Sequence, residues 1–286
     1  MENGQLYQMI LNSPSLPQIP ADLSEIILLL QDPDRVDIDQ LVKRVSELPK
    51  LETIILSYIN SPYFRMRRKI SSLREAIILL GMQTVQVVII ASVCQYLFPH
   101  GYARSNIFNK VRYIRHSIGV SIISCALAEE LRGGDRYQLF AYGLMHDIGI
   151  ALMDACFPEL VDAVYARIMK GSHQIIAERE VLGGACHPEV GAWIAERWSF
   201  PPNMINIIKN HHWPRIAEDN TYELQLIHLA DIISANYYEN MLLEYTRAPS
   251  SLALQNDLGI DQATIDRVTA ELPAEVTRVM GLFTMQ

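Results

Sequence analysis

The chain has 286 residues, of which half are hydrophobic and a fifth are charged, and its formal net charge is -8 at pH 7. This length allows one large or two small domains, and the negative charge argues against a nucleic-acid-binding surface, because a phosphate backbone would be repelled at long range. The four cysteines are widely spaced without a CxxC pair, which indicates reduced core thiols and excludes a disulfide framework.

The first hundred residues show the helical spacing of apolar side chains, without the alternation typical of strands. Ser72 and Glu75 form a capping box that predicts the start of a long apolar helix over 72–98. Breaks that contain Asp or Pro separate the other helices expected here, which cover 22–30, 38–48 and 49–59. We expect an N-terminal helical bundle in residues 1–105.

A second helical series begins near Asn106 and keeps the same spacing. The predicted helices cover 111–131, 137–155, 159–169, 187–198, 203–210 and 224–238. We assign residues 106–240 to a second helical domain. The remaining residues, 241–286, predict a C-terminal tail of two short helices separated near Pro273. The expected fold class is therefore all-α, in two parts.

No segment predicts secretion or membrane insertion. The N-terminus is polar and lacks the basic start and apolar run of a signal peptide. The most apolar window, 76–98, carries polar residues such as Gln83 and Gln95 on every turn, which favours a buried helix over a membrane span. We expect a cytoplasmic protein that binds neither nucleic acid nor a membrane.

Histidine and aspartate residues on separate predicted helices form the most informative pattern. Imidazoles bind borderline metals well, and carboxylates add hard oxygen ligands. The seven candidate ligands are His116, His146, Asp147, His187, His211, His212 and Asp231. Adjacent residues of a regular helix point about 100° apart, so His146 and Asp147 share an ion only where the helix ends or its neighbours crowd inward. Gly149 leaves room for close helix packing.

Each histidine also has a simpler interpretation, since a lone histidine on an apolar helix is usually a hydrogen-bonded core or surface residue. We prefer that interpretation for His100, His173 and His228. The apolar run 140–145 precedes the adjacent His-Asp pair, and an ionised aspartate there needs a partner. Together with the other candidate ligands, this pair favours a shared metal site.

Several of these residues and runs resemble the HDOD family, the HD-related output domains of bacterial signalling proteins. The second half contributes His116, His146-Asp147-Ile148-Gly149, His187 with Glu189-Val190-Gly191, and Asp231 within 229–231. The first half contributes the runs 16–20, 60–64 and 72–81. The resemblance covers about residues 14–240 and depends on the order and spacing of these motifs together.

The resemblance implies a divalent-metal site. In catalytic relatives, including the HD-GYP cyclic-di-GMP phosphodiesterases, one metal is held by residues matching His116, His146, Asp147 and Asp231. A second is completed by residues matching His187, His211 and His212, with the carboxylate matching Asp147 as the catalytic bridge. The implied chemistry is metal-assisted hydrolysis, in which two cations clamp the phosphate oxygens and lower the pKa of a bound water. Mixed imidazole and carboxylate ligation favours iron, manganese or zinc, as one or two ions.

The sequence departs from the catalytic relatives at three places. Ile150 stands where a lysine usually follows His-Asp-Ile-Gly, and Trp213-Pro214-Arg215 replaces the Gly-Tyr-Pro motif after the paired histidines. Arg112 stands one turn before His116, where some relatives have a metal-binding glutamate. Because residues i and i+4 share a helix face, Arg112 would bind a phosphate, pair with a site carboxylate, or remain a solvated arginine.

Two functions remain open. HDOD proteins are regarded as regulatory, so the leading hypothesis is a bacterial signal-transduction module that binds a metal together with a nucleotide or another phosphorylated ligand. A signalling protein would be its partner, and the aromatic and basic run 63–69 is a candidate contact surface or only a solvated loop. A weaker third option is a scaffold that dimerises through the N-terminal helices. The alternative, favoured by the retained histidines, is a metal-dependent phosphohydrolase or phosphodiesterase that acts on a nucleotide or cyclic dinucleotide.

Overall fold

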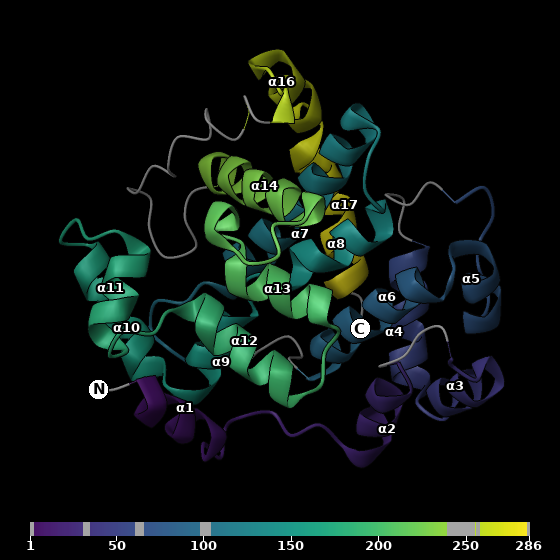
Figure 1. Cartoon of the computed structure of the whole chain (residues 1–286), viewed down its shortest axis with the longest axis horizontal. Coiled ribbons are helices and arrows are strands. Elements are labelled where there is room, and N and C mark those ends of the chain that lie inside the picture. The colour runs from purple at the N-terminus through teal and green to yellow at the C-terminus, as the bar shows by residue number, and fades with distance from the viewer. Residues whose placement is uncertain are drawn as a thin grey trace.

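Helices form all the regular secondary structure in the part of the chain that the computed structural model describes (Figure 1). That part comprises residues 3–30, 35–60, 66–97, 104–238, 255 and 258–284. No strand occurs within these ranges. The all-α fold expected from the helical spacing is therefore confirmed.

The N-terminal helices follow the predicted order, with one break that the sequence analysis missed. Their bounds are α2 Ala21–Leu29, α3 Ile38–Ser46, α4 Pro49–Ile59, α5 Leu73–Leu80 and α6 Met82–Leu97. The single helix expected over 72–98 was wrong, because Gly81 adopts φ 82° and separates α5 from α6. Ser72 caps α5 as expected, since its hydroxyl accepts a hydrogen bond from the N–H of Glu75.

An additional helix, α1 (Asn3–Leu11), precedes this series and was not predicted. Leu6 and Ile10, four residues apart, are fully buried and fix its apolar face. The ring of Tyr7 packs edge-on against Trp193, with the centroids 5.5 Å apart. The start of the chain therefore lies against α12 (His187–Arg197) of the second half.

The second half is arranged around α7, which packs against α8, α14 and α17 (Figure 1). The bounds of its first helices are α7 Lys110–Leu131, α8 Arg136–Met145, α9 Ile148–Cys156, α10 Pro158–Ile168 and α11 Gln174–Val181. Those that follow are α12 His187–Arg197, α13 Pro202–Asn210, the 3-10 helix η2 Pro214–Ile216, α14 Tyr222–Tyr238, α16 Gln262–Thr269 and α17 Leu272–Thr284.

Two expectations for this half need correction. The predicted continuous helix over 137–155 is divided at His146 and Asp147 into α8 and α9. The two tail helices exist, but their break lies at residues 270–271, and Pro273 falls in the first turn of α17. Proline fits there because the first N–H groups of a helix have no intrahelical acceptor.

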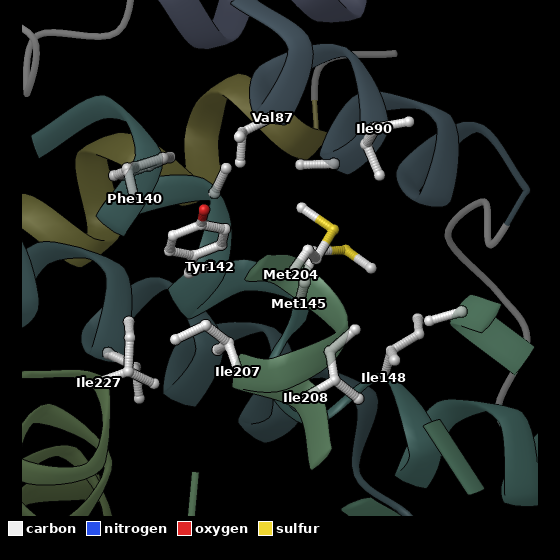
Figure 2. Close-up of a cluster of buried hydrophobic side chains, with 14 of the residues drawn as sticks. Val87, Ile90, Phe140, Tyr142, Met145, Ile148, Met204, Ile207, Ile208 and Ile227 are labelled. Carbon is white, nitrogen blue, oxygen red and sulfur yellow. The ribbon is translucent and has the colours of Figure 1, made fainter. Parts of the chain in front are cut away.

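A shared hydrophobic core connects the two halves. Helix α6 packs against both α4 and α8. Figure 2 shows Val87 and Ile90 of α6 facing Phe140, Met145 and side chains of α13 across this core. The halves therefore share buried surface, and the boundaries at 105 and 240 stay a prediction.

One stretch, Arg136–Cys156, is long and apolar enough to cross a membrane, judged by length and composition. Within its 18-residue window, 83% is buried inside the molecule. This stretch comprises α8, the break and α9, so core packing accounts for its apolar composition.

Candidate metal centre

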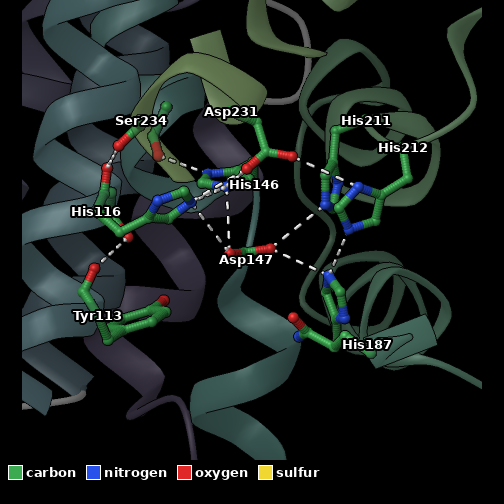
Figure 3. Close-up of polar contacts among 12 residues, drawn as sticks. Tyr113, His116, His146, Asp147, His187, His211, His212, Asp231 and Ser234 are labelled. Carbon is green, nitrogen blue, oxygen red and sulfur yellow. Dashed lines mark hydrogen bonds and ion pairs between the residues drawn. The ribbon is translucent and has the colours of Figure 1, made fainter. Parts of the chain in front are cut away.

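The structure brings all seven predicted ligands together around one point (Figure 3). They come from α7, the α8–α9 break, the start of α12, the end of α13 and α14. Their potential ligand atoms form two groups, within each of which all lie within 4.8 Å of one another. The first group is His116, His146 and Asp231, and the second is Asp147, His187, His211 and His212.

The break between α8 and α9 allows two adjacent residues to face the same centre. His146 ends α8 with helical angles, whereas Asp147 has φ -100° and ψ 16° and precedes the first residue of α9. Two residues later, a Cβ on Gly149 would lie 1.9 Å from the carbonyl oxygen of His187. Only glycine permits this approach of α9 to α12, which confirms the close packing expected at this position.

The two imidazoles of the first group face the carboxylate of Asp231 and that of Asp147 from the second group. His116 Nε2 lies 3.2 Å from Asp231 Oδ1, and His146 Nε2 lies 3.2 Å from Asp147 Oδ2. The two Nε2 atoms are 3.3 Å apart. This part of the centre is buried, with His146 fully inaccessible.

In the second group, the other oxygen of Asp147 is the focus. Asp147 Oδ1 lies 3.1 Å from His187 Nε2 and 3.3 Å from His211 Nε2. His212 Nε2 lies 3.1 Å from His187 Nε2, and its Nδ1 lies 3.4 Å from Asp231 Oδ2. Asp147 therefore faces both groups, with a different oxygen toward each.

The outer hydrogen bonds of three histidines determine which ring nitrogen faces the centre. His146 Nδ1 lies 2.8 Å from the carbonyl oxygen of Gly143, and His211 Nδ1 lies 2.9 Å from that of Ile208. His187 Nδ1 lies 2.8 Å from a carboxylate oxygen of Glu178. Because these oxygens only accept, each Nδ1 carries a proton, so Nε2 faces the centre with a lone pair in the neutral ring and with a second N–H in the doubly protonated ring.

When the rings are neutral, the centre therefore places acceptor Nε2 atoms opposite the acceptor oxygens of the carboxylates. Asp147 Oδ1 and His211 Nε2 are buried and have no hydrogen-bond partner among the described residues. Buried unsatisfied acceptors are costly, and a cation or additional protons would remove that cost. As metal ligands, the five imidazoles and two carboxylates fit a borderline divalent metal.

Both carboxylates are held in the ionised form. Burial raises the pKa of Asp147, but the charge of His146 and the short contacts with the rings of His146, His187 and His211 outweigh it and hold the pKa well below its usual range. Burial likewise raises the pKa of Asp231, and a hydrogen bond with His116 and the nearby imidazoles more than reverse this. The centre therefore carries negative charge that a cation would offset.

The histidines differ in their affinity for protons. Burial lowers the pKa of His187, but the charge of Glu178 and hydrogen bonds with Asp147 and Glu178 raise it to about 10. Burial lowers the pKa of His212 well below its usual value, and the neighbouring His211 lowers it further. In the metal-free chain, His187 is thus a preferred site for a proton.

Glu178 is a residue of the centre that the sequence analysis missed. It lies on α11, which was also not predicted, and its side chain is almost fully buried. Ala177, Val181 and Leu182 lie on the same side of this helix, so Glu178 interrupts an apolar stripe. A charged residue in such a stripe is the sequence signal that identifies it.

The remaining candidates lie at or outside the edge of the centre. Arg112 is half-buried one turn before His116, and its backbone N–H donates to Asn109 Oδ1. Its role toward a phosphate stays a prediction. His173 is exposed at the start of α11, and His228 is half-buried on α14. His100 and residues 63–65 of the predicted contact surface lie outside the described residues.

Comparison with known proteins agrees with this fold. A solved HDOD domain protein from Geobacter sulfurreducens aligns over 99% of both chains, with a TM-score of 0.75 and 22% identity. A solved protein from Shewanella amazonensis SB2B, provisionally described as a phosphohydrolase, aligns over 98% of both chains, with a TM-score of 0.73 and 22% identity. At this identity, the likeness establishes the fold alone.

The sequence comparisons are more specific about the family. An uncharacterised protein of Treponema pallidum (strain Nichols) is 25% identical over 209 residues, which are 69% of this chain. The aligned region spans only 37% of that relative, so the relative is considerably longer. The family model described as HDOD domain matches residues 16–214, which include six of the seven candidate ligands. The chain belongs to the HDOD domain family.

Proposed function

We propose that this chain is a regulatory signal-transduction module whose buried histidine–aspartate centre binds divalent metal. The observation that carries the proposal is the convergence of inward-facing Nε2 atoms on the ionised carboxylate of Asp147. Neutral imidazoles and carboxylates together suit iron, manganese or zinc better than calcium. The two groups of side chains would accommodate one ion or two.

In this proposal, each side chain has a definite task. Asp147 would offer Oδ2 to an ion among His116, His146 and Asp231, and Oδ1 to one among His187, His211 and His212. The backbone carbonyls of Gly143 and Ile208 keep two of the rings in the tautomer that can bind metal. The protein would therefore meet an incoming ion with its ligands already oriented.

Two features favour a regulatory role over catalysis. Ile150 occupies the position of the usual phosphate-facing lysine, and its side chain is buried in the core. Trp213, Pro214 and Arg215 replace the Gly-Tyr-Pro motif that reads a cyclic dinucleotide in relatives. We expect the centre to bind a nucleotide or another phosphorylated ligand, and a signalling protein partner to respond to that binding.

The test is metal analysis of the chain purified without chelator. The proposal predicts at least one equivalent of iron, manganese or zinc per chain, which dialysis against a chelator removes and added metal restores. A nucleotide titration of the loaded chain should then give saturable binding. A chain that takes up none of the three metals contradicts the proposal.

The second candidate function is a metal-dependent phosphohydrolase or phosphodiesterase. One observation favours it: the two oxygens of Asp147 face two separate ligand groups, as in sites that hold a pair of metals. A pair of ions supplies an activated water and neutralises phosphate charge when bound. The structural neighbour provisionally described as a phosphohydrolase is compatible with this alternative.

Turnover distinguishes the two candidates. The loaded chain would be incubated with a generic phosphodiester and with cyclic dinucleotides in the presence of manganese. The enzyme predicts release of phosphomonoester or phosphate that Asp147→Ala abolishes. The regulatory module predicts metal binding without turnover.

A further inference from the structure

Glu178 supports the metal centre from outside the set of candidate ligands. Its carboxylate oxygens lie 2.8 Å and 3.0 Å from His187 Nδ1. The same carboxylate accepts the backbone N–H of His187 at 2.9 Å, and Gln174 donates to it at 3.0 Å. Glu178 is therefore held in place by three hydrogen bonds, and its side chain is 2% exposed.

This contact distinguishes His187 from the other histidines of the centre. His146 and His211 donate their outer N–H to neutral backbone carbonyls three residues earlier on their own helices. His187 begins α12 and has no preceding turn of helix to supply such a carbonyl. The Glu178 carboxylate from α11 is the acceptor for His187 Nδ1 instead. It carries a full negative charge, whereas the acceptors of His146 and His211 are neutral carbonyl dipoles.

We infer that Glu178 is a positioning residue, which holds His187 with Nε2 toward Asp147 and strengthens divalent-metal binding in the group Asp147, His187, His211 and His212. The inference rests on the proposed metal-binding function. A carboxylate on the outer nitrogen fixes the ring orientation and makes the inner nitrogen a stronger ligand. The group His116, His146 and Asp231 has no contact with Glu178 among the described hydrogen bonds and should be less affected.

A purely structural role for Glu178 is the competing explanation, because it also accepts a backbone N–H at the start of α12. The chain offers a matched control for this role. Glu189 accepts the backbone N–H of Cys186 at 2.8 Å at the same helix start. It has no described bond to the ring of His187. Glu178→Gln and Glu189→Gln thus remove similar charges near one helix terminus, and only the first alters a ligand.

The experiment is a Co²⁺ titration of the metal-stripped chain, followed by the visible absorption of the bound ion. We expect Glu178→Gln to weaken one class of Co²⁺ site by about 10- to 100-fold and to change its spectrum, because outer partners of metal ligands typically contribute this much. The other class should keep its affinity. Glu189→Gln should bind Co²⁺ as the wild-type chain does.

The outcomes separate the two proposals. A Glu178→Gln chain that binds Co²⁺ with wild-type affinity and spectrum overturns this inference while leaving the proposed function intact. A wild-type chain that binds no Co²⁺, Mn²⁺ or Zn²⁺ overturns both. If Glu178→Gln does not fold, Glu178→Asp replaces it, since the shorter side chain keeps the charge but withdraws from Nδ1. Weakened binding supports the inference, and wild-type binding contradicts it.

Discussion

At the scale of single residues, the proposed metal site depends most on Asp147. Its two oxygens face imidazoles from four segments, and the rings of His146, His187 and His211 each turn Nε2 toward it. A buried arrangement of acceptors alone is unfavourable, so a cation would stabilise it strongly.

Replacing Asp147 with asparagine should weaken metal binding without unfolding the chain. The amide keeps the size of the side chain but loses the charge and one of the two bridging oxygens. We expect metal affinity to fall by at least about tenfold, measured as bound metal per chain after dialysis. Wild-type metal content in Asp147→Asn would contradict the bridging role.

Asp154 provides the control for this substitution. It is also buried on α9, but its carboxylate accepts the backbone N–H groups of Arg104 and Ser105. Asp154→Asn should lower the free energy of unfolding by about 1–3 kcal/mol, because one of these bonds loses its acceptor and the other keeps only a neutral one. Its metal content should remain that of the wild-type chain.

The pKa of His187 predicts opposite pH dependences for the metal-free and the metal-bound chain. Its folded pKa of about 10 lies above the unfolded value of about 6.5. Protonation of His187 therefore stabilises the metal-free chain fully below pH 6.5, and that stability is lost as the pH rises toward 10. Metal must displace this proton, so metal affinity should rise by about tenfold per pH unit over the same range.

Metal titrations at several pH values, together with urea unfolding of the stripped chain, measure both dependences. Between pH 6.5 and pH 9, we expect the unfolding free energy of the stripped chain to fall as the pH rises. Over the same range, the affinity for metal should increase. An affinity for metal that does not change with pH in this range would contradict the assignment of the proton to His187.

At the scale of elements, the site depends on where helices end. The α8–α9 break turns two adjacent side chains to one point, and the close approach of α9 to α12 brings His187 there. The histidines of α12 and α13 lie at helix ends, where the backbone direction changes. The ligand positions are therefore set by helix termini more than by helix faces.

Gly149→Ala tests this packing. Its added Cβ would lie 1.9 Å from the carbonyl oxygen of His187, so α9 and α12 must separate. We expect a loss of about 1–3 kcal/mol or more of unfolding free energy, together with weaker metal binding as His187 moves. Urea unfolding and metal analysis measure the two effects.

Gly4→Ala is the matched control, because a Cβ at Gly4 meets no atom within 4 Å and the residue lies inside α1. Alanine favours a helix over glycine by about 1 kcal/mol, so this variant should be as stable as the wild-type chain or slightly more stable. A Gly149→Ala chain as stable and as metal-rich as Gly4→Ala would contradict the packing argument.

Sequence patterns predicted the helices well and their interruptions poorly. Apolar spacing located α7, α12 and α14 within a few residues, because a core-facing stripe leaves a clear period. The breaks at Gly81 and at His146-Asp147 lie inside apolar runs, where that period continues across the interruption. Their cause is tertiary packing, which a local pattern does not contain.

For the metal site, the sequence predicted the candidate ligands well and the contacts that support them poorly. Residue type and motif order identified the seven side chains that the structure gathers together. Glu178 was not predicted because its partner, His187, is nine residues away on a different helix. Which imidazole nitrogen faces the centre also depends on contacts such as Gly143 with His146, and these appear only in the folded chain.

At the scale of the whole molecule, the centre joins elements that are distant in sequence. Its side chains come from α7, α8, α12, α13 and α14, and α8 packs in turn against α6 of the N-terminal half. A bound ion would therefore link most of the second half directly. Because α6 packs against both α8 and α4, a structural change at the metal centre would reach the N-terminal helices through these contacts.

Removal of metal should consequently lower the stability of the entire fold. An ion that binds only the folded chain, at about 1,000 times its dissociation constant, contributes about 4 kcal/mol. For a chain of this size, chelation should lower Tm by on the order of 10 °C. Differential scanning calorimetry measures this shift, and Asp147→Asn, which binds the ion more weakly, should show a smaller one. Equal Tm values with and without chelator would contradict a stabilising ion.

The most direct measurement for the central claim is anomalous diffraction from crystals of the chain grown with Mn²⁺ or Zn²⁺. The account predicts at least one anomalous peak in contact with Asp147, at about 2.0–2.2 Å from the carboxylate oxygen and from the Nε2 atoms that face it. Crystals that show no peak among these seven side chains, in a chain that keeps them in the same arrangement, would contradict it.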